Sequence, residues 1–359
     1  MCCRGIRRYR LTMTFEPPLR LLLDGSALVA NWRWLARESG DAQCGAAIKA
    51  EAYGLGAIDV LKRLGDAGCR DFFVASWGEA MALGRLPKGA SLAVLHGIRD
   101  CETAMGLRGL ARPVLNTPQE VARWKEADGG PCDVMFDTGM NRLGLPMEAA
   151  GSGLLDGLEI VTLMSHLACA DEPNHPLNRT QLSRFVALKG QIKARRYSLA
   201  NSAGICLGSD YAFDLTRPGL AIYGGVQADA AAPRIRQVAR IESQLLQIRD
   251  IGIGDSVGYN ATFTADRPMR IGVLNLGYAD GYLQGFSGHG RALVEGRALA
   301  VVGRVSMDLT AIDLSDAPSL AEGDWVQVDF NLPMASRQSG ISQYELLTGL
   351  GRRYHRLWL

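Results

Sequence analysis

The chain has 359 residues, of which 47% are hydrophobic and 21% charged, so its length and composition are those of a globular protein with room for two domains. A formal net charge of +2 at pH 7 gives no electrostatic reason to expect a nucleic-acid or membrane-surface partner. The eight cysteines form no Cys-x-x-Cys pair and the five histidines show no metal-binding spacing, so we expect reduced thiols and no metal site. No apolar run is long enough for a membrane span, and we expect a cytoplasmic protein.

Short apolar runs alternate with amphipathic segments from residue 21 to residue 228. Because the runs are apolar throughout, they indicate strands buried on both faces of a parallel sheet. We predict helices at 56–67, 77–86, 117–126 and 178–193, and eight strands at 45–49, 72–75, 91–95, 112–115, 133–137, 159–165, 197–200 and 219–223. This count predicts a (β/α)8 barrel of the TIM type. An open, doubly wound sheet is the competing fold, but the Gly-x-Gly-x-x-Gly turn expected after its first strand is absent.

Residues 229–359 show a different pattern. Gly-Asp turns separate some of the strand-like runs, which lie at 236–249, 256–264, 270–276, 291–294, 299–305, 309–314 and 325–330. We therefore predict an α/β chain in which a barrel over residues 21–228 is followed by a mainly β C-terminal domain over residues 229–359. Residues 1–20 are assigned to an N-terminal arm, with membership of the β domain as the alternative.

Lys49 stands at the end of the first predicted strand, in the run AIKAEAYGLG (47–56). Barrel enzymes keep their active sites at the carboxyl ends of the strands, and partial burial there lowers the pKa of a lysine and makes it a better nucleophile toward an aldehyde. Tyr53 and the two glycines that follow offer an anion a hydroxyl and close backbone approach. Taken alone, an ordinary lysine at a strand end is the simpler interpretation.

A second group of residues follows the last two predicted strands of the barrel. Asn201-Ser202 comes after the seventh strand, and the run RPGL (217–220) enters the eighth. Barrels commonly bind phosphate in these two loops, with hydroxyls and backbone N–H groups as donors. A plain helix cap is the alternative for the Asn-Ser pair.

Together these runs resemble the alanine racemase family, whose members are pyridoxal-phosphate-dependent amino-acid racemases with a barrel fold. Further matching motifs follow in the family's order, from DTGMNRLG (137–144) and SHLA (165–168) through RPGLAIYG (217–224), VGYNATFT (257–264) and GYADGY (277–282) to GRVSMD (303–308). Eight motifs in order, across both predicted domains, make the resemblance highly specific.

The resemblance implies a racemase that interconverts L-alanine and D-alanine and supplies D-alanine for peptidoglycan. Lys49 would bond to pyridoxal 5'-phosphate (PLP) and act as the acid and base on one face of the substrate, and Tyr259 would act on the opposite face. Two groups are needed because the proton leaves one side and is returned on the other. Arg217 would face the pyridine nitrogen. The implied cofactor site consists of Lys49, Tyr53, His166, Asn201, Ser202, Arg217, Gly219, Leu220 and Tyr223.

The resemblance also implies the substrate contacts and the assembly. Arg142 and the backbone N–H of Met307 would hold the substrate carboxylate, for which an arginine has a suitable pair of donors, and Tyr278 would line the entrance. In the family, a head-to-tail homodimer joins the barrel of one subunit to the β domain of the other. We therefore expect shared active sites in which Tyr259, Tyr278 and Met307 come from the neighbouring chain.

The sequence departs from the family pattern at two places near these residues. Met135 replaces a lysine that many members carry in carbamylated form to orient the following arginine, and Ser198 replaces a histidine. Our hypothesis is that a bound anion such as chloride, or another side chain, orients Arg142 instead.

Three alternatives keep part of this interpretation. A racemase of another small amino acid, such as serine, would retain every catalytic residue and differ only in pocket contacts worth roughly 1–3 kcal/mol. A non-catalytic PLP-binding barrel protein would lack the β domain. An amino-acid decarboxylase would place acidic residues and a cysteine from the partner at the substrate, which the run GYNATFT (258–264) fits poorly.

Overall fold

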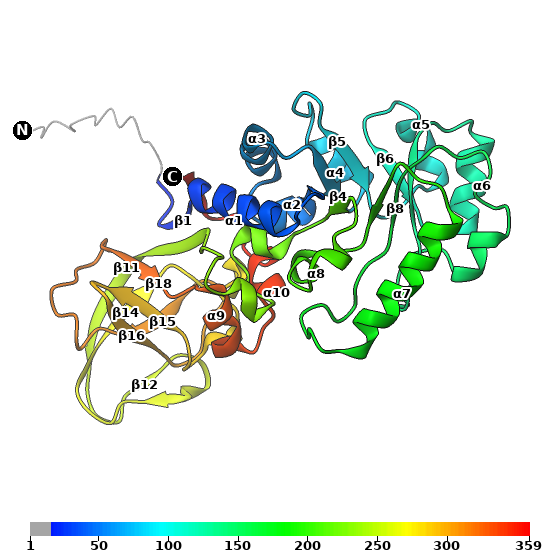
Figure 1. The fold of residues 1–359 in the computed structure, drawn as a ribbon. Coiled ribbons are helices and arrows are strands. Elements are labelled where there is room, and N and C mark those ends of the chain that lie inside the picture. Colours follow the sequence, from blue (N-terminus) through cyan, green and yellow to red (C-terminus); the bar gives the residue numbers. More distant parts are fainter. Residues whose placement is uncertain (1–15) are drawn as a thin grey trace, which may run out of the picture.

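Parallel strands form the barrel of this computed structural model, which describes residues 16–359 (Figure 1). Seven strands pair side by side in chain order: β3 (Ala46–Ala47), β4 (Asp71–Val74), β5 (Ser91–Val94), β6 (Arg112–Leu115), β7 (Cys132–Met135), β8 (Ile160–Met164) and β9 (Arg196–Ser198). Each coincides with one of the first seven predicted strands. Their side chains are buried on both faces in β4 and β7, as the apolar runs predict.

The eighth strand lies before the predicted position. Strand β10 (Leu215–Thr216) pairs in parallel with β2 (Gln43–Cys44), and the N–H of Arg217 donates to the Ala200 carbonyl at 2.9 Å, which joins the end of β10 to the segment after β9. The strand predicted at 219–223 is wrong, because Leu220–Tyr223 forms a 3₁₀-helix, η4. Pro218 has no N–H for a β-ladder, and the run after it is apolar because η4 is buried.

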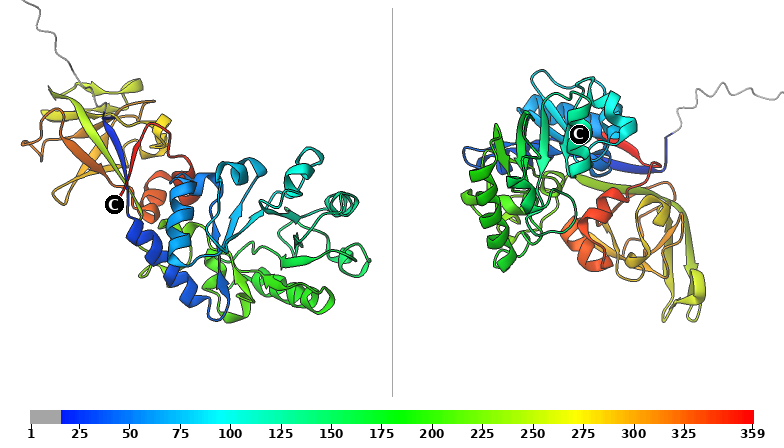
Figure 2. Two further views of the ribbon diagram at one scale, coloured as in Figure 1. Left: turned by 90° about the horizontal axis from the view of Figure 1, so that it is seen from above. Right: turned by 90° about the vertical axis from the view of Figure 1, so that its right-hand side faces the viewer.

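Helices surround the barrel strands (Figure 1; left view in Figure 2). The four predicted helices are observed at slightly different bounds, and α1, α5 and α8 were not predicted. The right-handed helices of the barrel are α1 (Gly25–Glu38), α3 (Ala57–Ala67), α4 (Trp77–Ala82), α5 (Thr103–Gly106), α6 (Pro118–Glu126), α7 (Pro176–Gln191) and α8 (Ser202–Ile205). The segment labelled α2 (Lys49–Tyr53) contains a left-handed turn. Asp24 caps α1 by accepting from the N–H of Ala27 at 2.8 Å.

The second domain is built on an eight-stranded sheet. Its order along the sheet is β14 (Met269–Leu274), β17 (Thr310–Asp313), β16 (Arg297–Val302), β15 (Arg291–Val294), β18 (Trp325–Val328), β11 (Ala239–Ile251), β1 (Leu19–Leu23) and β19 (His355–Trp358), with a further pairing of β14 to β11. Strand β1 runs antiparallel to β11 and parallel to β19, so both ends of the described chain join this sheet. The boundary expected after residue 20 therefore falls inside a strand of the β domain.

Two features of this domain differ from the prediction. The run at 256–264 is not one strand, because positive φ angles at Gly258 (79°) and Asn260 (60°) turn the backbone between β12 (Ser256–Val257) and β13 (Phe263–Thr264). The domain also ends with helices α9 (Leu332–Ser339) and α10 (Gln343–Thr348), which the strand pattern did not predict. Helix α10 packs against the segment that follows Lys49.

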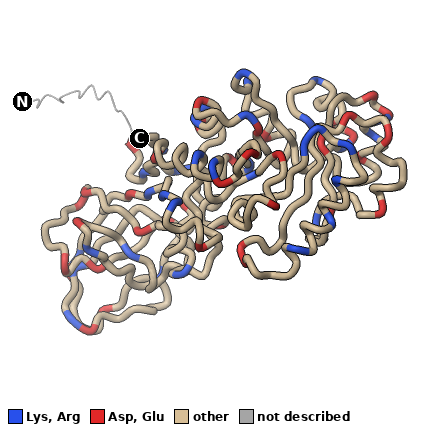
Figure 3. The backbone as a smooth tube through the Cα atoms, viewed as in Figure 1, with Lys and Arg blue, Asp and Glu red and all other residues tan. Residues whose placement is uncertain are grey.

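Positions of charged residues of both signs are distributed along the backbone of both domains rather than gathered by sign (Figure 3). This distribution agrees with the small net charge. No helix within residues 16–359 combines the length and the apolar composition required to cross a bilayer.

Candidate active site

A cavity of about 620 Å³ opens at the carboxyl ends of the barrel strands. Most of the predicted site residues meet there, because the loops that carry them follow strands β3, β7, β8, β9 and β10 at one end of the barrel. The predicted residues that line the cavity are Lys49, Tyr53, Arg142, His166, Asn201, Ser202, Arg217, Gly219 and Leu220. Tyr223, Tyr259, Tyr278 and Met307 do not line it.

Lys49 is followed by an unusual left-handed turn. Ala50, Glu51, Ala52 and Tyr53 all have φ angles between 51° and 56°, a conformation that costs roughly 1–2 kcal/mol for each non-glycine residue. Gly54 continues the turn with φ 86°, and a β-carbon there would lie 2.5 Å from the Leu347 carbonyl oxygen. Such strain persists only where the surroundings fix it, and it is typical of functional sites.

The amine of Lys49 is a weaker base than an exposed lysine. Burial in the cavity lowers its pKa, the nearby positive charge of Arg142 lowers it further, and the carboxylate of Glu79 opposes both effects. A larger neutral fraction makes the amine more nucleophilic toward a carbonyl group.

One end of the cavity is lined by the hydroxyl-bearing residues Tyr53 and Ser202. Ser202 Oγ accepts from the N–H of Gly219 at 2.9 Å and of Ala221 at 3.3 Å, which leaves its own proton free to donate. The Tyr53 hydroxyl lies against Gly219 so closely that a β-carbon at Gly219 would approach Tyr53 Cζ to 3.0 Å. Asn201 keeps the role of a helix cap, since its side chain accepts from the N–H of Gly204 at 2.8 Å.

Tyrosine rings form one wall at this end. The Tyr53 ring stacks on Tyr223 with centroids 4.7 Å apart and lies 6.2 Å from Tyr344. Tyr223 itself is fully buried and donates its hydroxyl proton to the Ala47 carbonyl at 2.7 Å, so the expectation that it contacts the cofactor directly is not supported by the geometry. Tyr344 and Gln227 line the cavity although the sequence analysis did not select them. Neither residue directly follows a barrel strand, and the carboxyl ends of the strands are where site residues were expected.

Arg217 occupies the inner end of the cavity and is 6% exposed. It donates to the Ser165 carbonyl at 2.5 Å and to the hydroxyl of Ser198, which in turn donates to the Leu215 carbonyl at 2.5 Å. Burial lowers the pKa of its guanidinium group to about 10, which still leaves the group charged at neutral pH. A fixed cation with donors therefore faces the cavity from the barrel interior.

His166 is held as a neutral imidazole. Burial lowers its pKa to about 3, and the positive charges of Arg217, Arg142 and Lys49 act in the same direction. A neutral imidazole in this position is suited to pack against a flat ring rather than to bind an anion as a cation.

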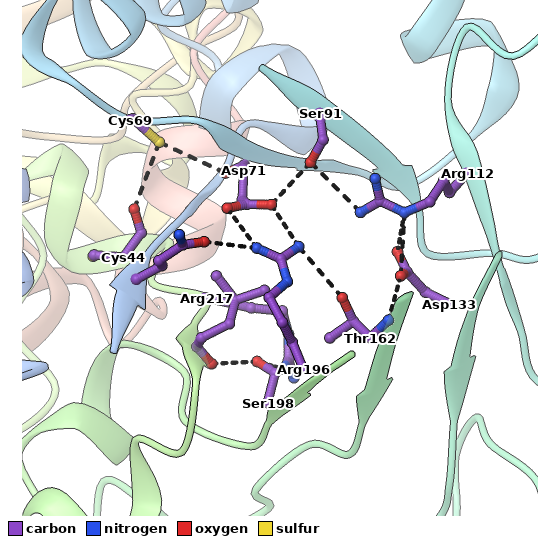
Figure 4. Close-up of polar contacts among 12 residues, drawn as sticks. Cys44, Cys69, Asp71, Ser91, Arg112, Asp133, Thr162, Arg196, Ser198 and Arg217 are labelled. Atoms are coloured by element: carbon purple, nitrogen blue, oxygen red, sulfur yellow. Dashed lines mark hydrogen bonds and ion pairs between the residues drawn. The ribbon is translucent and has the colours of Figure 1, made fainter. Parts of the chain in front are cut away.

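Beneath the cavity, the opposite end of the barrel interior contains a charged network (Figure 4). Arg196 bonds both carboxylate oxygens of Asp71, at 2.7 and 2.9 Å, and Arg112 bonds both oxygens of Asp133 at 3.2 Å. Asp133 also accepts from the N–H of Thr162 at 2.9 Å. These residues stand near the beginnings of β4, β6, β7, β8 and β9, so the network ties the strands together below the site.

The three remaining predicted residues gather on the β domain. Tyr259 is 70% exposed and Met307 is 53% exposed. The N–H of Tyr278 donates to the Ser306 carbonyl at 3.0 Å, which places the loops of Tyr278 and Met307 side by side, and Gly258 lies against Arg304 of the same region. Tyr259 and Met307 therefore lie at the surface of the β domain and outside the cavity of their own chain.

Comparison with known proteins agrees with this geometry. The family model described as alanine racemase, N-terminal domain, matches residues 23–227, and the model described as alanine racemase, C-terminal domain, matches residues 238–358. The chain belongs to the alanine racemase family.

Individual alanine racemases match over nearly the whole chain. The biosynthetic enzyme of Agrobacterium fabrum is 40% identical over 96% of this chain and 94% of its own length, and the catabolic enzyme of the same organism is 40% identical over 94% and 92%. The crystal structure of alanine racemase from Bartonella henselae with covalently bound pyridoxal phosphate has a TM-score of 0.89 at 34% identity and covers 95% of this chain and 99% of its own. The biosynthetic alanine racemase of Pseudomonas aeruginosa has a TM-score of 0.87 at 33% identity, with coverages of 96% and 100%.

Met135 and Ser198, the two positions at which the resemblance predicts other residues, both lie close to the cavity of this alanine racemase family member. Met135 lines the cavity as a buried thioether, and Lys49 is the one lysine among the lining residues, so the described chain provides no other lysine there to orient Arg142. The Arg142 backbone N–H donates to Asp137 at 3.1 Å, which fixes the loop but leaves the guanidinium group available to a ligand. Ser198, where the resemblance leads us to expect a histidine, accepts a hydrogen bond from Arg217 directly.

Proposed function

We propose that this chain is a PLP-dependent alanine racemase that interconverts L-alanine and D-alanine. The observation that supports this most directly is the convergence of Lys49, Arg217 and the Ser202 hydroxyl on one barrel-mouth cavity in a member of the alanine racemase family. When bound, the cofactor supplies an electron sink that acidifies the α-proton of the amino acid. Every other part of the reaction falls to residues of the protein.

The cavity fits the cofactor group by group. Tyr53, Ser202 and the backbone at Gly219 and Leu220 would hold the phosphate, and the tight packing of Tyr53 on Gly219 supports this, because it keeps donors close together where a larger residue would not fit. Tyr344 would contribute a further hydroxyl. Arg217 would donate to the ring nitrogen from the barrel interior, and Lys49 would bond to the aldehyde carbon.

Racemisation then requires two proton carriers on opposite faces of the substrate α-carbon. We assign Lys49 Nζ to one face and Tyr259 Oη to the other, with Arg142 and the Met307 N–H on the substrate carboxylate and Tyr278 at the entrance. Because Tyr259 lies outside the cavity of its own chain and is 70% exposed, it would act in the cavity of a second copy. The proposal therefore includes a head-to-tail homodimer with shared active sites.

The six cysteines of residues 16–359 form no disulfide, which supports a cytoplasmic location.

Optical rotation tests the activity. Purified protein with PLP should racemise L-alanine, and Lys49→Ala should abolish the change in rotation because it removes both the cofactor bond and one proton carrier. L-serine in parallel tests the alternative substrate. Racemisation that survives the Lys49 substitution would contradict the assignment of the cofactor lysine.

Subunit complementation tests the shared site. Lys49→Ala and Tyr259→Phe chains should each be inactive as homodimers. In a heterodimer, one of the two sites combines an intact Lys49 with an intact Tyr259, so random mixing of equal amounts should restore about one quarter of the wild-type activity. Mixed dimers seen by native mass spectrometry but without activity would argue that each site is built from one chain.

A further inference from the structure

The left-handed turn after Lys49 is held by a side chain outside the cavity. Glu79 stands in the first turn of α4 and uses both carboxylate oxygens as acceptors, one for the N–H of Ala50 at 2.8 Å and the other for the N–H of Ala75 at 2.7 Å. Ala50 is the first residue of the strained turn, and Ala75 follows the end of β4. The carboxylate thus joins the loops that follow two neighbouring barrel strands.

We propose that Glu79 is a positioning residue for Lys49, because its carboxylate ties the first amide of the left-handed turn to the end of strand β4 and so fixes where the Lys49 amine enters the cavity. Glu79 does not line the cavity and is not assigned a contact with substrate or cofactor. Its effect on the reaction passes through the backbone of the residue next to Lys49 and through its charge. The inference rests on the proposed role of Lys49.

A carboxylate is the group that this arrangement requires. Two backbone N–H donors converge on one side chain, and an ionised carboxylate accepts on both oxygens, whereas a glutamine amide would turn its NH₂ group toward one of the two donors. Ser76 caps α4 and accepts from the N–H of Glu79 at 3.3 Å, so the carboxylate also lies in the favourable first turn of the helix.

The charge of Glu79 also acts on the amine. Among the charged groups around Lys49, Arg142 lowers the pKa of the amine and Glu79 raises it, while His166 and Arg217 share the cavity. His166 is neutral, so its contribution to the charge around the amine is small. Removing the negative charge of Glu79 should therefore make the Lys49 amine less basic.

The barrel contains a matched control in Glu120. This residue stands in the first turn of α6, accepts from the N–H of Asn116 at 2.6 Å just after β6, and follows the capping residue Thr117. Its other oxygen packs against Gly97 in the loop after β5. Glu120 therefore joins two neighbouring loops as Glu79 does, but neither loop contains Lys49.

The test compares Glu79→Gln with Glu120→Gln in the full-length protein. In the cofactor-free form, trinitrobenzenesulfonate labelling of Lys49, read by peptide mass spectrometry across pH, should have its midpoint moved to lower pH by about half a unit or more in Glu79→Gln and unchanged in Glu120→Gln. In the loaded form, kcat should fall about tenfold or more in Glu79→Gln, with a smaller change in KM for alanine, because a displaced base weakens the chemical step.

The outcomes separate this inference from the proposed function. A Glu79→Gln protein with the labelling midpoint and the kcat of Glu120→Gln would overturn the positioning role while racemisation by the wild type stands. A wild type without racemisation would refute the function, and the labelling of cofactor-free protein would still decide the role of Glu79. If Glu79→Gln does not fold, Glu79→Asp keeps the charge but is too short to bond both amides, and wild-type kcat in that variant would overturn the inference.

Discussion

The substitution Gly219→Ala tests the phosphate end of the cavity with a single methyl group. A β-carbon at Gly219 would lie 3.0 Å from Tyr53 Cζ and closer still to its hydroxyl oxygen. The Tyr53 ring cannot swing away freely, because it stacks on the buried Tyr223 with centroids 4.7 Å apart and also lies 6.2 Å from the Tyr344 ring. Overpacking of this kind costs about 1–3 kcal/mol. If the whole cost falls on cofactor binding, the dissociation constant for PLP increases by about 5- to 150-fold.

The assay is a titration of cofactor-free protein with PLP, followed by absorbance, together with thermal unfolding of the same samples. Gly190→Ala is the matched control, since Gly190 lies within helix α7 with open space around its β-position. That change should leave PLP binding unaltered and raise stability by up to about 1 kcal/mol. Equal PLP affinity and equal unfolding temperature for Gly219→Ala and the wild type would refute the tight packing described between Tyr53 and Gly219.

Three further predictions concern charge. Burial and Arg217 hold the pKa of His166 at about 3 in the folded protein, against 6.5 in the unfolded chain. Its contribution to stability is therefore complete above pH 6.5 and is lost as the pH falls toward 3. In urea unfolding of the cofactor-free protein, His166→Gln should reduce this loss of stability at acid pH, and an unchanged loss would contradict the pKa shift. Ser198→Ala leaves a buried Arg217 donor unpaired and should cost about 1–3 kcal/mol in urea unfolding, with a smaller loss in Ser198→Thr. If an anion orients Arg142, exchange of chloride for gluconate at constant ionic strength should raise KM for alanine, whereas identical KM values would refute the anion hypothesis.

The sequence could predict the barrel because its strands are short, apolar and regularly spaced. Strands β4 and β7 are buried on both faces, so their burial is visible in composition alone. The same rule failed at residues 219–223, where an apolar run is buried as a 3₁₀-helix, because burial does not specify backbone conformation. It also failed at 256–264, since nothing in strand propensity reports the positive φ of Asn260.

Site residues could be predicted where a motif stood at a strand end, as for Lys49 and Ser202. Tyr344 and Gln227 could not, because they reach the cavity through tertiary packing of the C-terminal helices and of the segment between the domains. The left-handed turn could not be predicted either. Ala, Glu and Ala favour a right-handed helix, and the opposite hand depends on contacts from outside the turn as well as on its own hydrogen bonds. The outside contacts include the bond of Glu79 to the Ala50 N–H and the packing of Leu347 on Gly54.

The charges of the cavity explain several of these features together. Three basic residues, Lys49, Arg142 and Arg217, line the cavity. Within residues 16–359, only two carboxylates line it: Asp137 accepts hydrogen bonds from three backbone N–H groups, and Asp171 lies exposed. Burial lowers the pKa of both Lys49 and His166, and the excess of positive charge in the cavity lowers both further. The same excess attracts a ligand set with a phosphate at one end and a carboxylate at the other. Anionic groups bound in the cavity would offset part of this positive charge, and their presence would therefore oppose the lowering of the Lys49 pKa.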